Sequence, residues 1–252
     1  AKKLGIKKIL DLSKKLDIYK NAPELLSVSL GSAETSLINL TAAYATFANG
    51  GKKITPNLIS RIQDRRGKTI FNLSNRQCVG CDKFSYNSEN HPTIEYDNER
   101  VMSEETAYQI TSILEGVVKR GTAKKMKDLK VPLAGKTGTT NNNFDAWFIG
   151  YTSNLVIGVY VGYDNPRTLG KYETGSKAAL PIFKDFIKTA LYMEDFKEFK
   201  IPKGIYLTSI NYDNGLKSSL SDKNTIIEAL KFKDINNIDN NELISLNSYD
   251  KL

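Results

Sequence analysis

Residues 133–140, with the sequence LAGKTGTT, are the most informative stretch of this chain. They deliver a lysine, a hydroxyl and a glycine in immediate succession at the end of a strand-like run, as Lys136, Thr137 and Gly138. A cation beside a hydroxyl can hold a carboxylate, and a glycine lets another backbone come close. The three letters alone are weak evidence, because they also suit an ordinary strand end before a turn.

Two β-rich runs follow this stretch directly. Residues 145–151 read DAWFIGY and residues 155–164 read LVIGVYVGYD, with a short Thr-Ser-Asn turn between them. This pattern predicts a hairpin, so residues 132–163 are expected to form three adjacent antiparallel strands. Alternation along the first run places Trp147 and Ile149 on the same face of the sheet.

Further segments before and after the Lys-Thr-Gly stretch occur in a recognisable order. In chain order the matching segments are residues 30–32, 40–51, 116–123, 133–141, 145–151, 173–175 and 178–183. Together they resemble the C-terminal part of the transpeptidase domain of class A penicillin-binding proteins, over most of residues 1–192. The segment 73–100 and the tail after about residue 200 carry no such resemblance.

The resemblance implies a mixed α/β (α+β) fold of the penicillin-binding and serine β-lactamase-like type. An antiparallel sheet flanked by helices is expected, incomplete at its N-terminal side. Residues 1–195 would form the C-terminal portion of the transpeptidase domain, with residues 73–100 as a polar insertion. Residues 196–252 are rich in Asn, Asp, Lys and Ser, and are expected to be a loosely ordered polar extension with a short strand at residues 205–210.

Local patterns predict helices and one further hairpin. Thr35 or Ser36 is expected to cap one helix and Ser103 another. Residues 64–67 read as the turn of a hairpin. The expected helices span residues 3–20, 36–49, 103–120 and 177–192. Their expected buried faces include Ala107, Ile110, Ile113, Leu114 and Val117 in the third helix, and Ala179, Ile182, Phe183, Phe186 and Ile187 in the fourth.

The resemblance also implies a reaction and roles for the opening motif. An active-site serine would attack the penultimate peptide carbonyl of a D-alanyl-D-alanine stem peptide, and an amine of a neighbouring stem would resolve the acyl-enzyme. Lys136 would capture the substrate carboxylate and support proton transfer, Thr137 would add a hydroxyl hydrogen bond, and Gly138 would let the substrate backbone approach. Thr139 would supply a backbone N–H to the oxyanion hole, and its hydroxyl could also touch the carboxylate.

The serine nucleophile of this reaction is missing from the expected place. No Ser-x-x-Lys occurs in residues 1–135. The nucleophile, a Ser-x-Asn element, a glycosyltransferase region and a membrane anchor are therefore expected upstream of Ala1, and the fragment alone is expected to be inactive. Ser248 and Lys251 match Ser-x-x-Lys by letters, but they lie in the polar tail, which is no rigid support for a catalytic pair.

Composition limits the partners. The net charge of the 252 residues is +8, from 36 basic and 28 acidic residues, which suits an anionic polymer or a membrane face. Nucleic acid is not expected, because the chain has no basic ribbon interleaved with aromatic residues and no zinc-finger spacing. The expected partners are peptidoglycan stem peptides and β-lactam antibiotics, with no cofactor and no metal. No apolar run reaches the ~20 residues of a membrane span.

The only two cysteines are Cys78 and Cys81, separated by two residues in a polar stretch. In a reducing cytosol this spacing would suggest a redox or metal half-site, although His91 is the only histidine. The family resemblance instead implies the periplasmic face of the bacterial inner membrane, where disulfides persist. A small disulfide-clamped loop between Cys78 and Cys81 is expected there.

Two other functions remain open on sequence alone. A serine β-lactamase-like hydrolase would share the fold and the Lys-Thr-Gly strand, but residues 44–51 and 145–151 resemble the biosynthetic class more closely. A non-catalytic cell-wall-binding fragment is compatible with the missing nucleophile.

Overall fold

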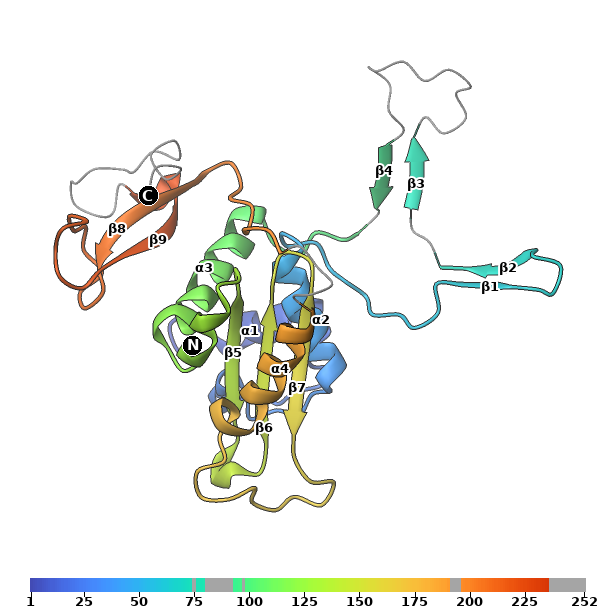
Figure 1. Ribbon diagram of the computed structural model, residues 1–252, viewed down its shortest axis with the longest axis horizontal. Helices are drawn as coiled ribbons and strands as arrows, with labels where there is room; N and C mark the ends of the chain where they lie inside the picture. The colour runs from blue at the N-terminus through green and yellow to red at the C-terminus, as the bar shows by residue number, and fades with distance from the viewer. Residues whose placement is uncertain (74–75, 80–92, 97, 191–195, 236–252) are drawn as a thin grey trace.

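The computed structural model describes residues 1–73, 76–79, 93–96, 98–190 and 196–235. At its centre is a three-stranded antiparallel sheet in the order β5-β6-β7 (Figure 1). The strands are β5 (Ala134–Thr139), β6 (Ala146–Tyr151) and β7 (Val156–Val161). The sequence-based prediction of three adjacent antiparallel strands is therefore confirmed, and so is the mixed α/β fold.

Helices pack on both faces of this sheet, and α3 (Glu104–Arg120) also packs on β5. α2 (Leu37–Ala48) packs on the face that carries Gly158, where a side chain would collide with the Thr41 hydroxyl. α4 (Leu180–Ala190) packs on the opposite face, where the rings of Phe148 and Phe183 meet edge to face at 4.6 Å between centroids. β6 therefore lies between packed layers, which explains why most of its residues are apolar and buried, whereas Lys136 and Thr139 of β5 are exposed.

The helices α2 and α3 begin at the serines that the sequence predicts, whereas α1 (Ile6–Lys15) and α4 begin three residues later than expected. The Ser36 hydroxyl accepts the Asn39 N–H at 3.2 Å at the start of α2. The Ser103 hydroxyl accepts the Thr106 N–H at 3.3 Å at the start of α3. Such caps satisfy backbone donors that have no partner within the helix. α1 opens the chain, followed by a short 3-10 helix, η1 (Leu26–Leu30). None of the helices in the described ranges is both long and apolar enough to cross a membrane.

The largest core cluster lies between α4, the sheet and the segment after α3. Its fully buried members include Met126, Phe148, Leu180, Phe183 and Ile187. Phe183 is 0% exposed, so its truncation to alanine would remove about 3–5 kcal/mol of stability. A second cluster joins α3 to β5 and β6, where the buried Tyr151 hydroxyl pairs with Thr111 at 2.9 Å.

Some predicted core positions are wrong. Ile113, Ile182 and Phe186 are 61%, 52% and 55% exposed. A helix laid on a sheet buries only a narrow stripe, and the stripes here run through Val118 in α3 and through Phe183 and its neighbours in α4. The predicted apolar faces of these two helices were therefore wider than the stripes that are buried among the described residues.

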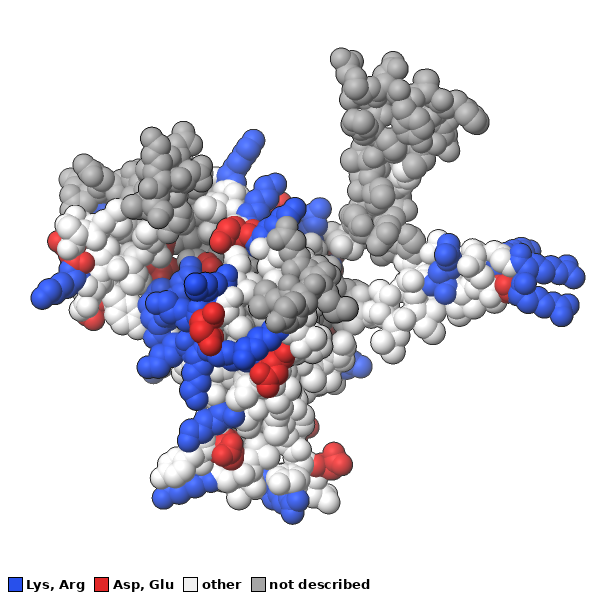
Figure 2. Space-filling view, in the orientation of Figure 1, with Lys and Arg blue, Asp and Glu red and all other residues white. Residues whose placement is uncertain are grey.

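The described residues between Lys53 and Glu99 form an excursion between α2 and α3 (Figure 1). It contains two hairpins that extend away from the sheet, β1 (Arg61–Gln63) with β2 (Thr69–Asn72) and β3 (Arg76–Val79) with β4 (Thr93–Tyr96) (Figure 1). Lysine and arginine side chains gather at the outer end of the first hairpin (Figure 2). The hairpin predicted around residues 64–67 is present, and the Asp64 carboxylate accepts the N–H groups of Arg66 and Lys68 in its turn.

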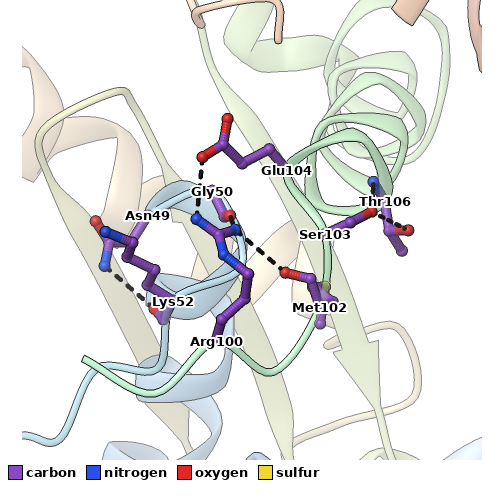
Figure 3. A network of polar contacts seen from close by, with 8 residues as sticks. All are labelled: Asn49, Gly50, Lys52, Arg100, Met102, Ser103, Glu104 and Thr106. Atoms are coloured by element: carbon purple, nitrogen blue, oxygen red, sulfur yellow. Dashed lines mark hydrogen bonds and ion pairs between the residues drawn. The ribbon is translucent and has the colours of Figure 1, made fainter. Parts of the chain in front are cut away.

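Arg100 closes the base of this excursion (Figure 3). Its guanidinium donates to the Gly50 carbonyl oxygen at 2.8 Å and to the Glu104 carboxylate at 3.0 Å. An isolated antiparallel β-bridge joins the backbones of Lys52 and Arg100 at the same level. The end of α2 and the start of α3 are therefore held together independently of the hairpins beyond them.

The C-terminal segment differs from the prediction of a loosely ordered extension. β8 (Ile205–Asn211) and β9 (Thr225–Lys231) form an antiparallel hairpin, followed by the short helix α5 (Phe232–Ile235). β9 docks on α3, where Gln109 donates to the Ala229 carbonyl oxygen at 3.2 Å and Arg120 pairs with Glu228 at 2.6 Å. Residues 236–252 lie outside the described residues.

We expect Arg100→Ala to lower the free energy of unfolding by about 1–2 kcal/mol, because it removes charge-assisted hydrogen bonds at a partly exposed site. Arg65→Ala is the matched control, since among the described residues the Arg65 side chain has no partner. Chemical denaturation of the two variants measures the difference. Equal stability of both would show that the hairpin base does not depend on Arg100.

Glu115 in α3 gives a pH-dependent prediction. Burial raises the pKa of its carboxyl, the Lys119 ammonium at 3.2 Å only partly offsets this, and Glu198 and Glu228 raise it further. The folded state therefore disfavours the carboxylate, and this penalty is present above the unfolded pKa of about 4.3 and absent well below it. Glu115→Gln should raise the melting temperature at pH 7 but not near pH 3.5.

The exposed Glu24, which has no partner within the described ranges, is the control for this experiment. Glu24→Gln should leave the melting temperature unchanged at both pH values. A loss of stability for Glu115→Gln at pH 7 would mean that the ion pair with Lys119 outweighs the cost of burial.

Candidate active site

A cavity of about 610 Å³ lies beside β5, on the sheet face that also carries α2. The loop before α2 forms one wall, and the Lys-Thr-Gly strand forms the opposite one. Its lining includes residues 30–35, Leu37, Tyr44, Lys136–Thr140, Trp147, Ile149 and Tyr160. The cavity therefore brings together the motif strand and the first two matching segments of the sequence.

Lys136 is exposed, and its ammonium group lies at this cavity. Its Nζ donates to the Thr137 carbonyl oxygen at 2.8 Å, and in the described part of the chain it has no acidic partner. An unneutralised ammonium at a cavity wall attracts an anion. The position matches the sequence-based assignment of Lys136 to a carboxylate, which stays a prediction.

The outer edge of β5 is unpaired among the described residues, because β5 pairs only with β6. The Thr140 N–H bonds the Asp145 carbonyl oxygen at 3.1 Å, one step beyond the pair of Thr139 and Ala146. Since antiparallel pairs alternate, Thr139 and Thr137 direct their N–H and C=O groups away from β6. The Thr139 N–H is therefore available at the edge where an oxyanion donor was predicted.

Thr137 is fixed from outside the sheet. Its hydroxyl lies 2.9 Å from the Thr122 hydroxyl, in the segment that follows α3. This contact points to the face opposite Lys136, because Thr137 is the next residue on the strand. Thr122 belongs to a segment quoted above for its resemblance, but no pattern in the sequence indicated that it would reach the motif strand.

Thr139 is held by the turn before α4. Its hydroxyl accepts the Gly175 N–H at 3.0 Å. One lone pair of this oxygen is thus committed to the protein, and the hydroxyl proton remains available for a substrate acceptor. A contact of this hydroxyl with the substrate carboxylate stays a prediction.

Gly175 begins a π-helical turn, η4 (Gly175–Ala179), that runs directly into α4. A Cβ at this position would collide with the carbonyl oxygens of Trp147 and Gly138, the latter at 2.5 Å. Only glycine lets the turn come this close to both strands. Residues 173–175 are one of the matching segments of the sequence, and the structure links this segment to Thr139 through Gly175.

The turn between β5 and β6 is ordered by side chains. The Thr140 hydroxyl accepts the Asp145 N–H at 2.8 Å. The Asp145 carboxylate accepts the Tyr160 hydroxyl at 2.8 Å, and this hydrogen bond raises the pKa of Tyr160. The Tyr160 ring packs against Trp147 at 4.8 Å between centroids. Asp145 therefore supports the turn, and Trp147 lines the cavity.

Four residues discussed from the sequence lie outside the described residues, namely Cys81, His91, Ser248 and Lys251. Cys78 lies on β3 and is disulfide-bonded, and its pairing with Cys81 stays a prediction. Within the described ranges no group of His, Cys, Asp or Glu side chains could hold a metal ion. The expected absence of a metal and of a cofactor also stays a prediction.

Comparison with known proteins gives consistent matches. Residues 3–188 match the family described as penicillin binding protein transpeptidase domain. The chain is 40% identical over 247 residues to penicillin-binding protein 1A of Rickettsia felis, covering 97% of this chain and 31% of the relative. It is 31% identical over 262 residues to penicillin-binding protein 1A of Pseudomonas aeruginosa, covering 92% and 32%. The chain thus spans about a third of the length of these relatives.

Solved structures of penicillin-binding proteins are also similar to this chain. The crystal structure of penicillin-binding protein 1A from Haemophilus influenzae superposes with a TM-score of 0.73 and 30% identity, over 89% of this chain and 36% of that one. A penicillin-binding protein of Mycobacterium tuberculosis gives a TM-score of 0.55 and 26% identity, over 73% and 46%.

Gly175→Ala should displace the π-helical turn and cost about 1–3 kcal/mol, because the new methyl group meets two backbone oxygens that cannot rotate away. Gly116→Ala in α3 is the matched control. The nearest atoms to its added methyl belong to the Arg120 guanidinium, which can shift at the cost of part of its ion pair with Glu228, while alanine favours a helix, so stability should change by less than about 1 kcal/mol. Thermal melts compare the two, and equal effects would contradict the close packing at Gly175.

Proposed function

This chain belongs to the penicillin-binding protein transpeptidase family, and we propose that it forms the carboxylate-binding part of a peptidoglycan D-alanyl-D-alanine transpeptidase. The observation that carries the proposal is the ammonium of Lys136, which has no acidic partner among the described residues and lies beside a cavity on a strand whose outer edge pairs with none of them. A peptide with a terminal carboxylate fits this arrangement. The edge offers backbone hydrogen bonds and the ammonium offers the charge.

The reaction proceeds in two acyl transfers. A serine oxygen attacks the penultimate D-alanyl carbonyl carbon, the peptide C–N bond breaks, and the terminal D-alanine leaves with the proton that the serine gave up. An amine of a second stem peptide then attacks the ester carbonyl, and the serine oxygen regains a proton as the cross-link forms. Water in place of the amine gives a carboxypeptidase.

Four residues of the motif strand have roles in that reaction. Lys136 binds the terminal carboxylate of the substrate and favours proton transfer at the nucleophile. The Thr137 hydroxyl, which also contacts Thr122, adds a hydrogen bond where the carboxylate meets the open edge of β5, and Gly138 leaves room for the substrate backbone. The Thr139 N–H, which points away from β6, donates to the developing oxyanion, a contribution of about 3 kcal/mol for one such donor.

The remaining catalytic groups would come from the rest of the protein. The chain covers 31% of the length of its Rickettsia felis relative, so a longer protein can supply the serine, its partner lysine and a Ser-x-Asn element. A glycosyltransferase region and a membrane anchor would belong to that same part. The proposed location is the periplasmic face of the bacterial inner membrane, where a disulfide between Cys78 and Cys81 would persist.

A fluorescent penicillin tests this function. The longer protein that contains this chain should become covalently labelled, whereas the 252-residue chain alone should not, because no Ser-x-x-Lys precedes the motif strand. Labelling of the isolated chain at a mapped serine would contradict the division of the site. Rapid hydrolysis of the label by the longer protein would favour a β-lactamase-like hydrolase.

In the longer protein, Lys136→Met should slow acylation by about 100-fold or more without unfolding the domain, because it removes a charge aimed at the substrate carboxylate. Lys203→Met is the matched control, since Lys203 is exposed and lies on the C-terminal segment before β8. Stopped-flow acylation with a thermal melt of each variant separates the two effects. Wild-type acylation by Lys136→Met would remove Lys136 from the site.

A further inference from the structure

The segment between α3 and β5 contains a 3-10 helix, η2 (Lys124–Leu129). In a 3-10 helix side chains three residues apart lie on the same side. Met126 is 2% exposed and packs with Leu129 in the main core cluster. The Lys184 ammonium donates to the Lys125 carbonyl oxygen and to the Asp128 carboxylate, both at 2.7 Å. Two sides of η2 are therefore occupied, one by the core and one by α4.

The third side carries only lysines. Lys124 and Lys127 are exposed and lie about 6 Å apart along the helix, as three residues at the 3-10 rise require. Lys130, also exposed, caps the helix in the left-handed conformation, with φ 52° and ψ 34°. This conformation is uncommon for a residue with a side chain. We call these three residues the lysine row.

The lysine row is not neutralised. Within the described ranges none of its three ammonium groups has an acidic partner. Figure 2 shows lysine and arginine side chains gathered over the C-terminal end of α3 and the segment leading to β5. Like charges this close repel one another, and the scaffold holds their backbone rigidly through Met126 and Lys184. An anionic ligand would relieve this repulsion.

The position of η2 connects the lysine row to the motif strand. Thr122 lies two residues before η2 and contacts Thr137 at 2.9 Å. Thr137 faces the side of β5 opposite Lys136. An extended peptide paired with the outer edge of β5 presents alternate side chains to opposite faces, so one set points toward the Lys136 cavity and the other toward the face on which Thr137 contacts the segment leading into η2.

We propose that Lys124, Lys127 and Lys130 form a second anion subsite, which binds side-chain carboxylates of a peptide lying along the outer edge of β5. This inference rests on the proposed function. Alternate residues of an extended peptide are about 6.6 Å apart, close to the spacing of Lys124 and Lys127. A single-stranded nucleic acid fits less well, because residues 121–130 contain no aromatic side chain on which a base could stack.

The test uses the longer protein and two synthetic peptides ending in D-alanyl-D-alanine. One peptide has free side-chain carboxylates, and in the other these groups are carboxamides. The row variant is Lys124→Gln, Lys127→Gln and Lys130→Gln together. The matched control is Lys7→Gln, Lys8→Gln and Lys15→Gln, which removes the same charge from exposed positions of α1. The measured quantity is kcat/KM for release of D-alanine from each peptide.

We expect the wild type to prefer the free-carboxylate peptide. In the row variant the ratio of the two kcat/KM values should fall roughly tenfold, mainly through KM, the size expected when three exposed charge pairs are lost. The control should keep the wild-type ratio. Replacement of the lysine row by three arginines should restore the preference, which a merely structural role of the lysines would not predict.

Three results would overturn the inference. An unchanged ratio in the row variant is the first. An equal fall in the control is the second, because it would show a general charge effect. The third is weaker binding of a single-stranded oligonucleotide by the row variant with unchanged peptide kinetics. If the wild type neither releases D-alanine nor reacts with a fluorescent penicillin, the proposed function itself fails, and the subsite fails with it.

Discussion

The open outer edge of β5 is the constraint on which the rest of the site depends. A strand pairs on two sides, and in the described part of the chain β5 uses only one of them, toward β6. Alternation of the ladder then turns the backbone groups of Thr137 and Thr139 outward. A peptide substrate can be held there by main-chain hydrogen bonds, while Lys136 supplies the charge that selects a carboxylate.

An open edge is useful only if it is held still, and two contacts do this. Thr122 fixes Thr137 from the segment after α3, and Gly175 fixes Thr139 from the turn before α4. Behind them lies the main core cluster, in which Phe183 is fully buried. The open strand is thus backed by a closely packed core, so the substrate meets groups that are already in position.

The sequence predicted the parts of the structure that local patterns determine. Alternation gave the three strands, and Ser36 and Ser103 marked the helix starts. The strand at residues 205–210 was predicted and corresponds to β8, but its partner β9 was missed, because a polar connection separates the two strands and part of their packing is against α3. The contact of Thr139 with Gly175 joins residues 36 positions apart, which no local pattern reveals.

Amide hydrogen exchange along β5 tests the open edge most directly. In the 252-residue chain the Gly138 N–H faces β6, whereas the Thr137 and Thr139 N–H groups face outward. The account predicts slow exchange at Gly138 and fast exchange at Thr137 and Thr139. Equally slow exchange at all three amides would show that the outer edge is covered, and would contradict the proposed place of the substrate.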